Sequence, residues 1–201
     1  DMVYETAAGR VAVEFDGDEH YRHTLKIKSD RDKDAAALAA NYQVVRFPYW
    51  VHRVARGGDI AYPGPGANAL QWIDARDLAQ LVVTLSETTW TGAVHACGEF
   101  PAISYRDMLD RVASVLAPAG TSFHEIDPSR LEDHSWYQKF PLWNGDESSP
   151  VMDMDNSLAR SLGMPLTSLE ETTLDTASWL DSVAAPSWWL SSDVESELLA
   201  G

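Results

Sequence analysis

Polar and apolar positions alternate along the chain in two periods, which predict short strands and helices that follow one another. Apolar runs bounded by glycine or proline predict strands, and apolar residues three or four positions apart predict helices. The expected strands cover residues 10–15, 43–47, 59–62, 70–73, 93–97 and 122–126. The expected helices cover residues 35–40, 49–56, 74–85, 104–116, 156–162 and 168–183. This alternation predicts a fold of the α/β class.

Capping and breaking residues set the limits of the expected helices. Ser104 and Ser168 can accept hydrogen bonds from the unpaired N–H groups at a helix start, and we expect Asn156 to do the same for a shorter helix. Gly57 and Gly58 end the helix before them, because glycine adopts the left-handed conformation found at helix C-termini. In the last helix, the spacing predicts four inward side chains: Leu169, Thr172, Leu174 and Leu180.

The charge of the chain excludes several classes of partner. Its 201 residues include 31 acidic and 15 basic side chains, which give a formal net charge of -16. Such a surface repels phosphate backbones and anionic lipid headgroups, so we expect no nucleic acid and no membrane as partners. No apolar run has the length of a membrane span and no signal peptide is visible, which predicts a cytoplasmic protein.

Cysteine and histidine usage indicates neither a disulfide nor a metal site. Cys97 is the single cysteine and lies in an apolar stretch, so we expect a buried structural thiol. The six histidines show no spacing typical of metal ligands.

Three blocks of sequence carry a resemblance to one enzyme family: residues 46–60 continuing into 63–66, residues 71–79, and residues 141–143 with 154–157. The second block reads Gln-Trp-Ile-Asp-Ala-Arg-Asp-Leu-Ala. In order and spacing the blocks resemble the substrate-side half of the NAD-dependent epimerase/dehydratase family, the extended short-chain dehydrogenases/reductases.

The resemblance covers residues 43–183, with residues 1–42 as a poorly matched N-terminal segment and 184–201 as an acidic, tryptophan-containing tail. It implies part of a Rossmann-like sheet and a smaller C-terminal α/β subdomain that binds substrate. It also implies an NAD(P)-dependent oxidoreductase or epimerase/dehydratase, with NAD or NADP as the cofactor of the full-length family.

Two motifs of this family are missing, so its N-terminal half is absent or diverged. Pyrophosphate binding requires a glycine-rich turn, and neither G-x-x-G-x-x-G nor G-x-G-x-x-G occurs. The catalytic Tyr-x-x-x-Lys is also absent. Tyr42 stands four residues before Arg46, which is too basic to shuttle protons, so Tyr42 is either a catalytic candidate or a coincidental match. We therefore expect this chain alone to be inactive and not to hold NAD(P) tightly.

One further departure bears on the substrate. Leu70 stands where nucleotide-sugar epimerases of the superfamily carry an arginine that pairs with the nucleotide phosphate. This favours a small, less charged hydroxy or carbonyl compound. We expect its pocket between residues 46–53, Gln71 and the aromatic stretch 136–143. The candidate substrate-binding residues are Arg46, Tyr49, Trp50, Arg53, Gln71 and Trp143.

These candidates also have a structural interpretation. The basic and aromatic residues of 46–53 could equally form a packed helix start, and the other aromatics could fill the core. Asp74 and Asp77 are expected to cap the helix that follows them, with a salt link to Arg76. For function, the alternatives are a non-catalytic remnant of the family that binds a small molecule and a structural remnant without a ligand. A homodimer is compatible with each of them.

Overall fold

The computed structural model describes the chain in six segments: residues 2–6, 9–13, 47–130, 140–143, 153–182 and 189–200. For the first two segments only the backbone is described. Two expected elements, the helix at 35–40 and nearly all of the strand at 43–47, lie outside the described residues.

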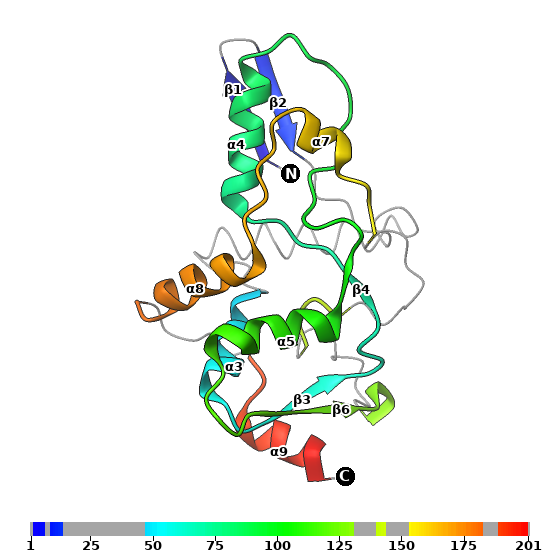
Figure 1. Cartoon of the computed structure of the whole chain (residues 1–201), viewed down its shortest axis with the longest axis vertical. Coiled ribbons are helices and arrows are strands. Elements are labelled where there is room, and N and C mark those ends of the chain that lie inside the picture. Colours follow the sequence, from blue (N-terminus) through cyan, green and yellow to red (C-terminus); the bar gives the residue numbers. More distant parts are fainter. Residues whose placement is uncertain are drawn as a thin grey trace.

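The described segments form a mixed α/β structure, which confirms the expected class at that level (Figure 1). Their strands are β1 (Met2–Thr6), β2 (Gly9–Val13), β3 (Asp59–Pro63), β4 (Ala69–Leu70), β5 (Ile103–Ser104) and β6 (Ser122–Ile126). Their helices are α3 (Phe47–Arg56), α4 (Ala75–Ser86), α5 (Tyr105–Leu116), α7 (Ser157–Ser161), α8 (Leu169–Leu180) and α9 (Ser192–Ala200), with a 3-10 turn at Pro128–Arg130. None of these helices has the length and apolar character needed to cross a bilayer.

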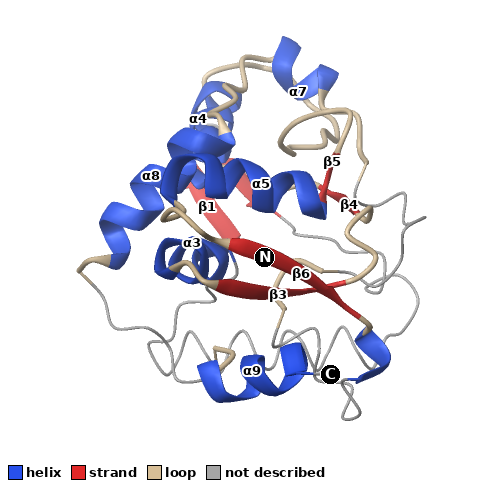
Figure 2. Cartoon of the chain, turned by 60° about the horizontal axis from the view of Figure 1, so that its bottom comes forward, coloured by secondary structure: helices blue, strands red, loops and turns tan. Residues whose placement is uncertain are grey.

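Strands β3 and β6 form the parallel pair that organises the larger part of the described structure. Asp59 faces Ser122 at one end of the pair and Pro63 faces Ile126 at the other. Helices α3, α5 and α8 pack on one another. Figure 2 shows α5 on one side of the strand pair and α9 on the other. The remaining strands pair antiparallel, β1 with β2 and β4 with β5.

Trp50 of α3 lies at the centre of the apolar core. Its buried ring meets Tyr105 edge-on at 5.7 Å and stacks on Phe140 at 6.2 Å between ring centroids. The indole Nε1 donates a hydrogen bond to the Pro141 carbonyl at 2.8 Å, and Tyr105 Oη donates to the same oxygen at 3.2 Å. Buried indole and phenol groups need such partners. One carbonyl therefore ties residues 140–143 to two helices.

The local signals for helix limits are confirmed at several positions. Ser104 Oγ accepts from Asp107 N at 2.9 Å, and the Asp107 carboxylate accepts from Ser104 N, which completes a capping box at α5. Ser168 caps α8 in the expected manner. Gly57 and Gly58 follow α3 with φ values of 69° and 77°, the left-handed region where glycine has no steric cost.

The strand expected at residues 70–73 is wrong beyond its first residue. Strand β4 is Ala69–Leu70, and the backbone leaves the ladder at Gln71. There the Gln71 side chain takes the position of a neighbouring strand, because its Oε1 accepts from Met154 N at 2.7 Å and its Nε2 donates to Met154 O at 2.8 Å. A side-chain amide thus carries the hydrogen-bond pattern of a peptide group.

The strand expected at residues 93–97 and the capping role expected for Asn156 are both wrong. Asn156 makes no side-chain bond to the helix α7 that it precedes. Its Nδ2 instead donates to the carbonyls of Cys97, at 3.0 Å, and Gly98. These carbonyls are satisfied by one side chain, and no strand pairs with residues 93–97 within the described part of the chain.

Helix α8 packs Leu169 and Leu180 towards the core as expected, but not Leu174. Leu169 and Thr173 are fully buried, whereas Leu174 is 49% exposed, so its predicted inward orientation is wrong. The buried positions are four residues apart, one turn of helix. Thr172 lies half-buried because its hydroxyl donates to Asp74 at 2.8 Å. In the acidic tail, α9 was not expected from the sequence.

We expect Ser104→Ala to lower the free energy of unfolding by about 1 kcal/mol, because the first turn of α5 loses its side-chain acceptor. Urea denaturation followed by tryptophan fluorescence measures this change. Ser114→Ala is a matched control in the same helix, since that hydroxyl only donates to the Arg111 carbonyl one turn earlier. It should change stability by less than about 0.5 kcal/mol. Equal losses in the two variants would contradict the capping role.

Candidate functional site

The predicted binding residues of α3 are packed inside the protein. Tyr49 and Trp50 are buried, and so is Trp143, which belongs to the same apolar cluster. Burial raises the pKa of Tyr49 well above its ordinary value, so its phenol stays protonated and cannot act as a base near neutral pH. Arg46 and Tyr42 lie outside the described residues.

The Arg53 guanidinium donates hydrogen bonds to groups inside the fold. Its Nε donates to Glu195 at 2.7 Å, its Nη1 to the Gly57 carbonyl at 2.8 Å, and its Nη2 to the Asp59 carbonyl at 2.6 Å. Both ends of the Arg53–Glu195 ion pair are more than nine-tenths buried. Internal partners therefore account for this side chain, and its binding of a substrate stays a prediction.

Gln71 connects segments that are distant in sequence. Besides its two bonds to Met154, its Nε2 donates to the Glu99 carbonyl at 3.1 Å. The adjacent Trp72 stacks on Phe47 with 5.9 Å between ring centroids, so the start of α3 lies beside the segment that contains Gln71. Most of the aromatic stretch 136–143 lies outside the described residues, so the pocket expected between it, α3 and Gln71 also stays a prediction.

Asp74, at the N-cap of α4, holds the junction to α8 by charge and hydrogen bonds. Its Oδ1 accepts from the backbone N of Arg76, and its Oδ2 accepts from Arg76 Nη2 and from Thr172 Oγ1. The Arg76 guanidinium lowers the pKa of Asp74 from 3.8 to about 2. The capping role and the salt link to Arg76 expected for Asp74 are both present.

Asp77 makes a second link, between α4 and the loop before α8. Its carboxylate is buried and accepts from Thr167 N at 2.6 Å and from Thr167 Oγ1 at 2.7 Å. These bonds join the carboxylate to a different segment of the chain, whereas the capping expected for Asp77 would have joined it to the first turn of its own helix.

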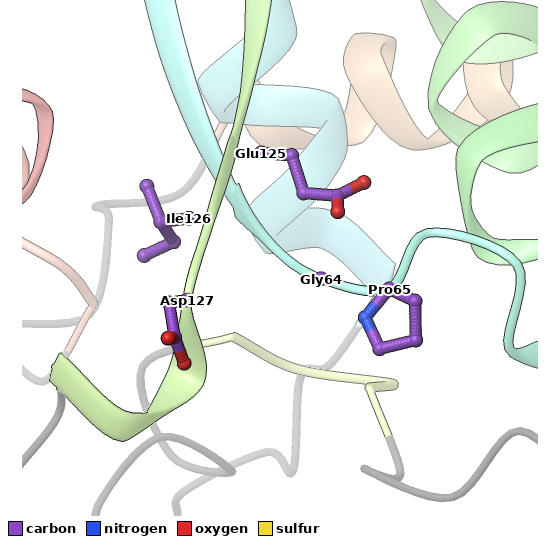
Figure 3. Close-up of a pocket in the computed structure, with 5 residues that line it drawn as sticks. All are labelled: Gly64, Pro65, Glu125, Ile126 and Asp127. Carbon is purple, nitrogen blue, oxygen red and sulfur yellow. The ribbon is translucent and has the colours of Figure 1, made fainter.

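An open depression of about 350 Å³ lies at the carboxyl ends of β3 and β6. It is lined by Gly64, Pro65, Glu125, Ile126 and Asp127. Figure 3 shows the Glu125 side chain on the side of Gly64 and Pro65, whereas Ile126 points the other way. In open α/β sheets, ligands bind outside the carboxyl ends of parallel strands. This depression is therefore the candidate site within the described residues.

Three side chains connect at this depression through hydrogen bonds. Tyr62 Oη donates to Glu125 Oε2 at 3.1 Å, and Arg106 Nη1 donates to Tyr62 Oη at 3.4 Å. The Arg106 guanidinium lies over the Tyr62 ring, 5.4 Å from its centroid. Burial raises the pKa of Tyr62, so its phenol remains a neutral hydrogen-bonding group. The arrangement offers a carboxylate acceptor to a ligand with hydroxyl groups, and the buried Tyr62 holds that carboxylate in place.

The absence of a side chain at Gly64 leaves room for this placement of Glu125. A Cβ added there would lie 2.5 Å from Glu125 Oε1, closer than any real contact. The Glu125 carboxylate thus packs directly on the loop backbone. Any larger residue at position 64 would displace it.

The loop at residues 63–66 does not fit a dinucleotide pyrophosphate. Such a site needs free backbone N–H groups. Gly64 N donates to the Ile126 carbonyl at 2.9 Å, Gly66 N lies 3.4 Å from Glu125 Oε2, and Pro65 has no N–H. The carboxylates of Glu125 and Asp127 would also repel phosphate. Within the described residues, no group of three His, Cys, Asp or Glu side chains could hold a metal ion.

Glu125 and Asp127 were not among the predicted site residues, although the loop at 63–66 lies in the first block of resemblance. The depression forms only when β3 pairs with β6, and Tyr62 and Glu125 are 63 residues apart. A usable signal was present, since both strands end in polar or glycine residues and parallel strands place such ends at the same edge.

Comparison with known proteins assigns the chain to no family. No family model matches it, and neither a curated protein nor a solved structure is significantly similar to it.

We expect the stabilisation by Asp74 to disappear in acid. Because its pKa is 3.8 when unfolded and about 2 when folded, the benefit is present above about pH 4 and is lost as the pH falls towards 2. Asp74→Asn keeps a cap acceptor but does not titrate, so it is the matched control. At neutral pH the wild type should be more stable than this variant by about 1 kcal/mol, a modest value because Arg76 is 55% exposed. Denaturant melts over a pH series measure the difference; one that stays constant down to about pH 2 would contradict the role of this carboxylate.

Proposed function

We propose that this chain is the substrate-side portion of an NAD(P)-dependent oxidoreductase or epimerase/dehydratase of the extended short-chain dehydrogenase/reductase family, and that it binds a small hydroxy or carbonyl compound in the cytoplasm. The observation that carries the proposal is that the three blocks of resemblance contact one another in the fold. Such contacts are expected if the three blocks form one substrate-side unit.

Side-chain hydrogen bonds make the contacts between the blocks. Trp50 of the first block donates to Pro141 of the third. Gln71 of the second block exchanges two hydrogen bonds with Met154 of the third. Each contact satisfies a buried or half-buried polar group, so these residue types are used for specific geometry. These contacts support the interpretation of the three blocks as parts of one substrate-side unit.

The finer fold assignment belongs to the same proposal. We place the chain in a partial Rossmann-like arrangement with a smaller substrate-binding α/β subdomain. The parallel β3–β6 pair, with helices on either side, supports it, since parallel pairing requires a long crossover connection and is typical of such folds.

The depression at the carboxyl ends of β3 and β6 supports the substrate class. Glu125 and Asp127 give it negative charge, which disfavours phosphorylated and carboxylate substrates. Leu70 stands in place of a phosphate-pairing arginine, which also disfavours a phosphorylated substrate. A neutral compound with a hydroxyl group can donate a hydrogen bond to the Glu125 carboxylate.

For the parent enzyme we propose hydride transfer between nicotinamide and a carbon that bears oxygen. The nucleotide-binding half of the family would supply the cofactor site and the catalytic tyrosine, because the described residues fit neither; Tyr42 remains a candidate. The alternative is a small-molecule-binding remnant without catalysis. The backbone N–H groups of Gly64 and Gly66 already have hydrogen-bond partners within the fold. This favours the non-catalytic alternative for the chain taken alone.

We expect the purified chain to bind NAD(H) and NADP(H) only at about millimolar concentrations or above, because the backbone donors a pyrophosphate needs are absent or already bonded. Isothermal titration calorimetry with each of the four dinucleotides measures this. Micromolar affinity would reveal a cofactor site that the described residues do not provide.

A fusion protein tests the proposed activity. The chain is joined to a nucleotide-binding half that carries a glycine-rich turn and Tyr-x-x-x-Lys, and oxidation of NADPH is followed with a panel of small ketones and aldehydes. We expect turnover with the fusion and none with either part alone. Glu125→Gln should raise KM by about five- to tenfold through a weakened hydrogen bond. Glu87→Gln, on the exposed end of α4, should leave KM unchanged.

The outcomes separate the two functions. A fusion that folds and binds NADPH without consuming any carbonyl compound, while the chain alone binds one of them in calorimetry, would favour the non-catalytic remnant. The absence of both turnover and binding for every compound of the panel would contradict both proposed functions.

A further inference from the structure

Arg106 of α5 stands beside the depression at the ends of β3 and β6 without lining it. Its backbone N donates to the Gly66 carbonyl at 2.9 Å, which attaches α5 to the loop at 63–66. Its guanidinium lies over two rings, 5.4 Å from the centroid of Tyr62 and 5.0 Å from that of Phe123. A positive charge is therefore fixed next to a depression whose charged lining side chains are carboxylates.

Asp110, one turn further along α5, holds this guanidinium by two hydrogen bonds. Arg106 Nε donates to Asp110 Oδ2 at 3.0 Å, and Arg106 Nη2 donates to Asp110 Oδ1 at 2.9 Å. A bidentate pair of this kind fixes the orientation of the guanidinium as well as its position. With two of its nitrogens engaged in this way, Arg106 directs Nη1 to Tyr62 Oη at 3.4 Å.

The Tyr62 hydroxyl separates Arg106 from Glu125. It accepts from Arg106 Nη1 and donates to Glu125 Oε2 at 3.1 Å. The ion pair that Arg106 makes among the described residues is with Asp110 and not with Glu125. Gly66 N also lies at Glu125 Oε2, at 3.4 Å. Within this part of the chain, Glu125 Oε1 is therefore the oxygen left to accept from a ligand.

A guanidinium released from Asp110 would have a stronger acceptor within reach than the Tyr62 hydroxyl. A carboxylate attracts a guanidinium by its charge and can accept two parallel hydrogen bonds from it, whereas a phenol offers one neutral oxygen. Glu125 is the carboxylate on the other side of that hydroxyl. Its pairing with Arg106 would occupy the acceptor of the depression and cancel its charge.

We propose that Asp110 is a specificity-determining residue, which holds Arg106 away from Glu125 and so keeps the Glu125 carboxylate free to accept a hydrogen bond from a ligand hydroxyl group. The inference rests on the proposed function, since it concerns ligand binding in the same depression. It assigns a role in binding to a residue that neither lines the depression nor bonds to Glu125.

Asp110→Ala tests the proposal with three neutral probes: hydroxyacetone, dihydroxyacetone and glyceraldehyde. A heteronuclear NMR titration of the purified chain, followed at the amides of Gly64 and Gly66, measures each dissociation constant. We expect Asp110→Ala to raise the constant about five- to tenfold, the loss also expected for Glu125→Gln, because both changes remove the free acceptor. Glu87→Gln removes a negative charge at the exposed end of α4 and should leave the constant unchanged. An unchanged constant in Asp110→Ala, for a probe that the wild-type chain binds, would overturn the inference.

A double variant, Asp110→Ala with Arg106→Met, separates the released arginine from other effects of losing Asp110. Methionine keeps an apolar contact with the rings of Tyr62 and Phe123 but brings no charge to Glu125. We expect the double variant to bind the probes within about twofold of the wild-type chain. A loss as large as in Asp110→Ala alone would show that the arginine is not the cause, and would overturn the inference.

The pairing can also be measured without a ligand, by urea denaturation of a double-mutant cycle with Arg106→Met and Glu125→Gln. The coupling between these two substitutions should be about threefold larger, in the unfolding equilibrium constant, in the Asp110→Ala background than in the wild-type background. The reason is that the ion pair between Arg106 and Glu125 forms only when Asp110 is removed. Equal coupling in the two backgrounds would contradict the inference, whichever ligand the depression takes.

The two measurements separate this inference from the proposed function. Binding of a probe without the extra coupling would leave the proposed function standing and overturn the role of Asp110. The extra coupling without binding of any probe would support the restraint of Arg106 by Asp110 and contradict the proposed ligand class.

Discussion

A two-stranded sheet leaves a row of backbone N–H and carbonyl groups unpaired along each outer edge, and this fold depends on side chains that satisfy them. Buried backbone groups without partners cost about as much as a lost hydrogen bond each. Arg53 and Glu195 fill this role at β3, and outside the sheets Gln71 and Asn156 satisfy the backbone groups of Met154 and Cys97 in the same way. Each of these side chains also connects segments far apart in the sequence. The same bonds that satisfy the backbone therefore fix the relative positions of the elements.

The sequence predicts well what is decided locally. Ser104 and Ser168 begin helices because capping involves only the next three residues, and Gly57 ends one because its own φ angle is decisive. The strand at 122–126 was also expected, and β6 occupies those residues. The strand at 93–97 was expected from composition, but a strand needs a partner, and the local pattern does not contain one.

The candidate site was predicted less well, because its geometry arises from pairing between distant segments. Glu125 looks like a surface acid in the sequence, and its relation to Gly64 appears only when β3 and β6 lie in register. Glu195 presents the same difficulty, since an acid in an acidic tail gives no sign that it is buried beside an arginine. Of the predicted candidates, the structure places Tyr49, Trp50 and Trp143 in the core and gives Arg53 and Gln71 internal partners.

The thiol of Cys97 can serve as a chemical probe of the structure around it. The thiol is buried, burial raises its pKa, and its carbonyl is held by Asn156. Only the thiolate reacts with alkylating or disulfide reagents, so the folded chain protects this atom both by access and by protonation. Because the chain has a single cysteine, whose thiol donates to the Met154 carbonyl, the rate of its modification reports opening of the structure around this one atom without any introduced label.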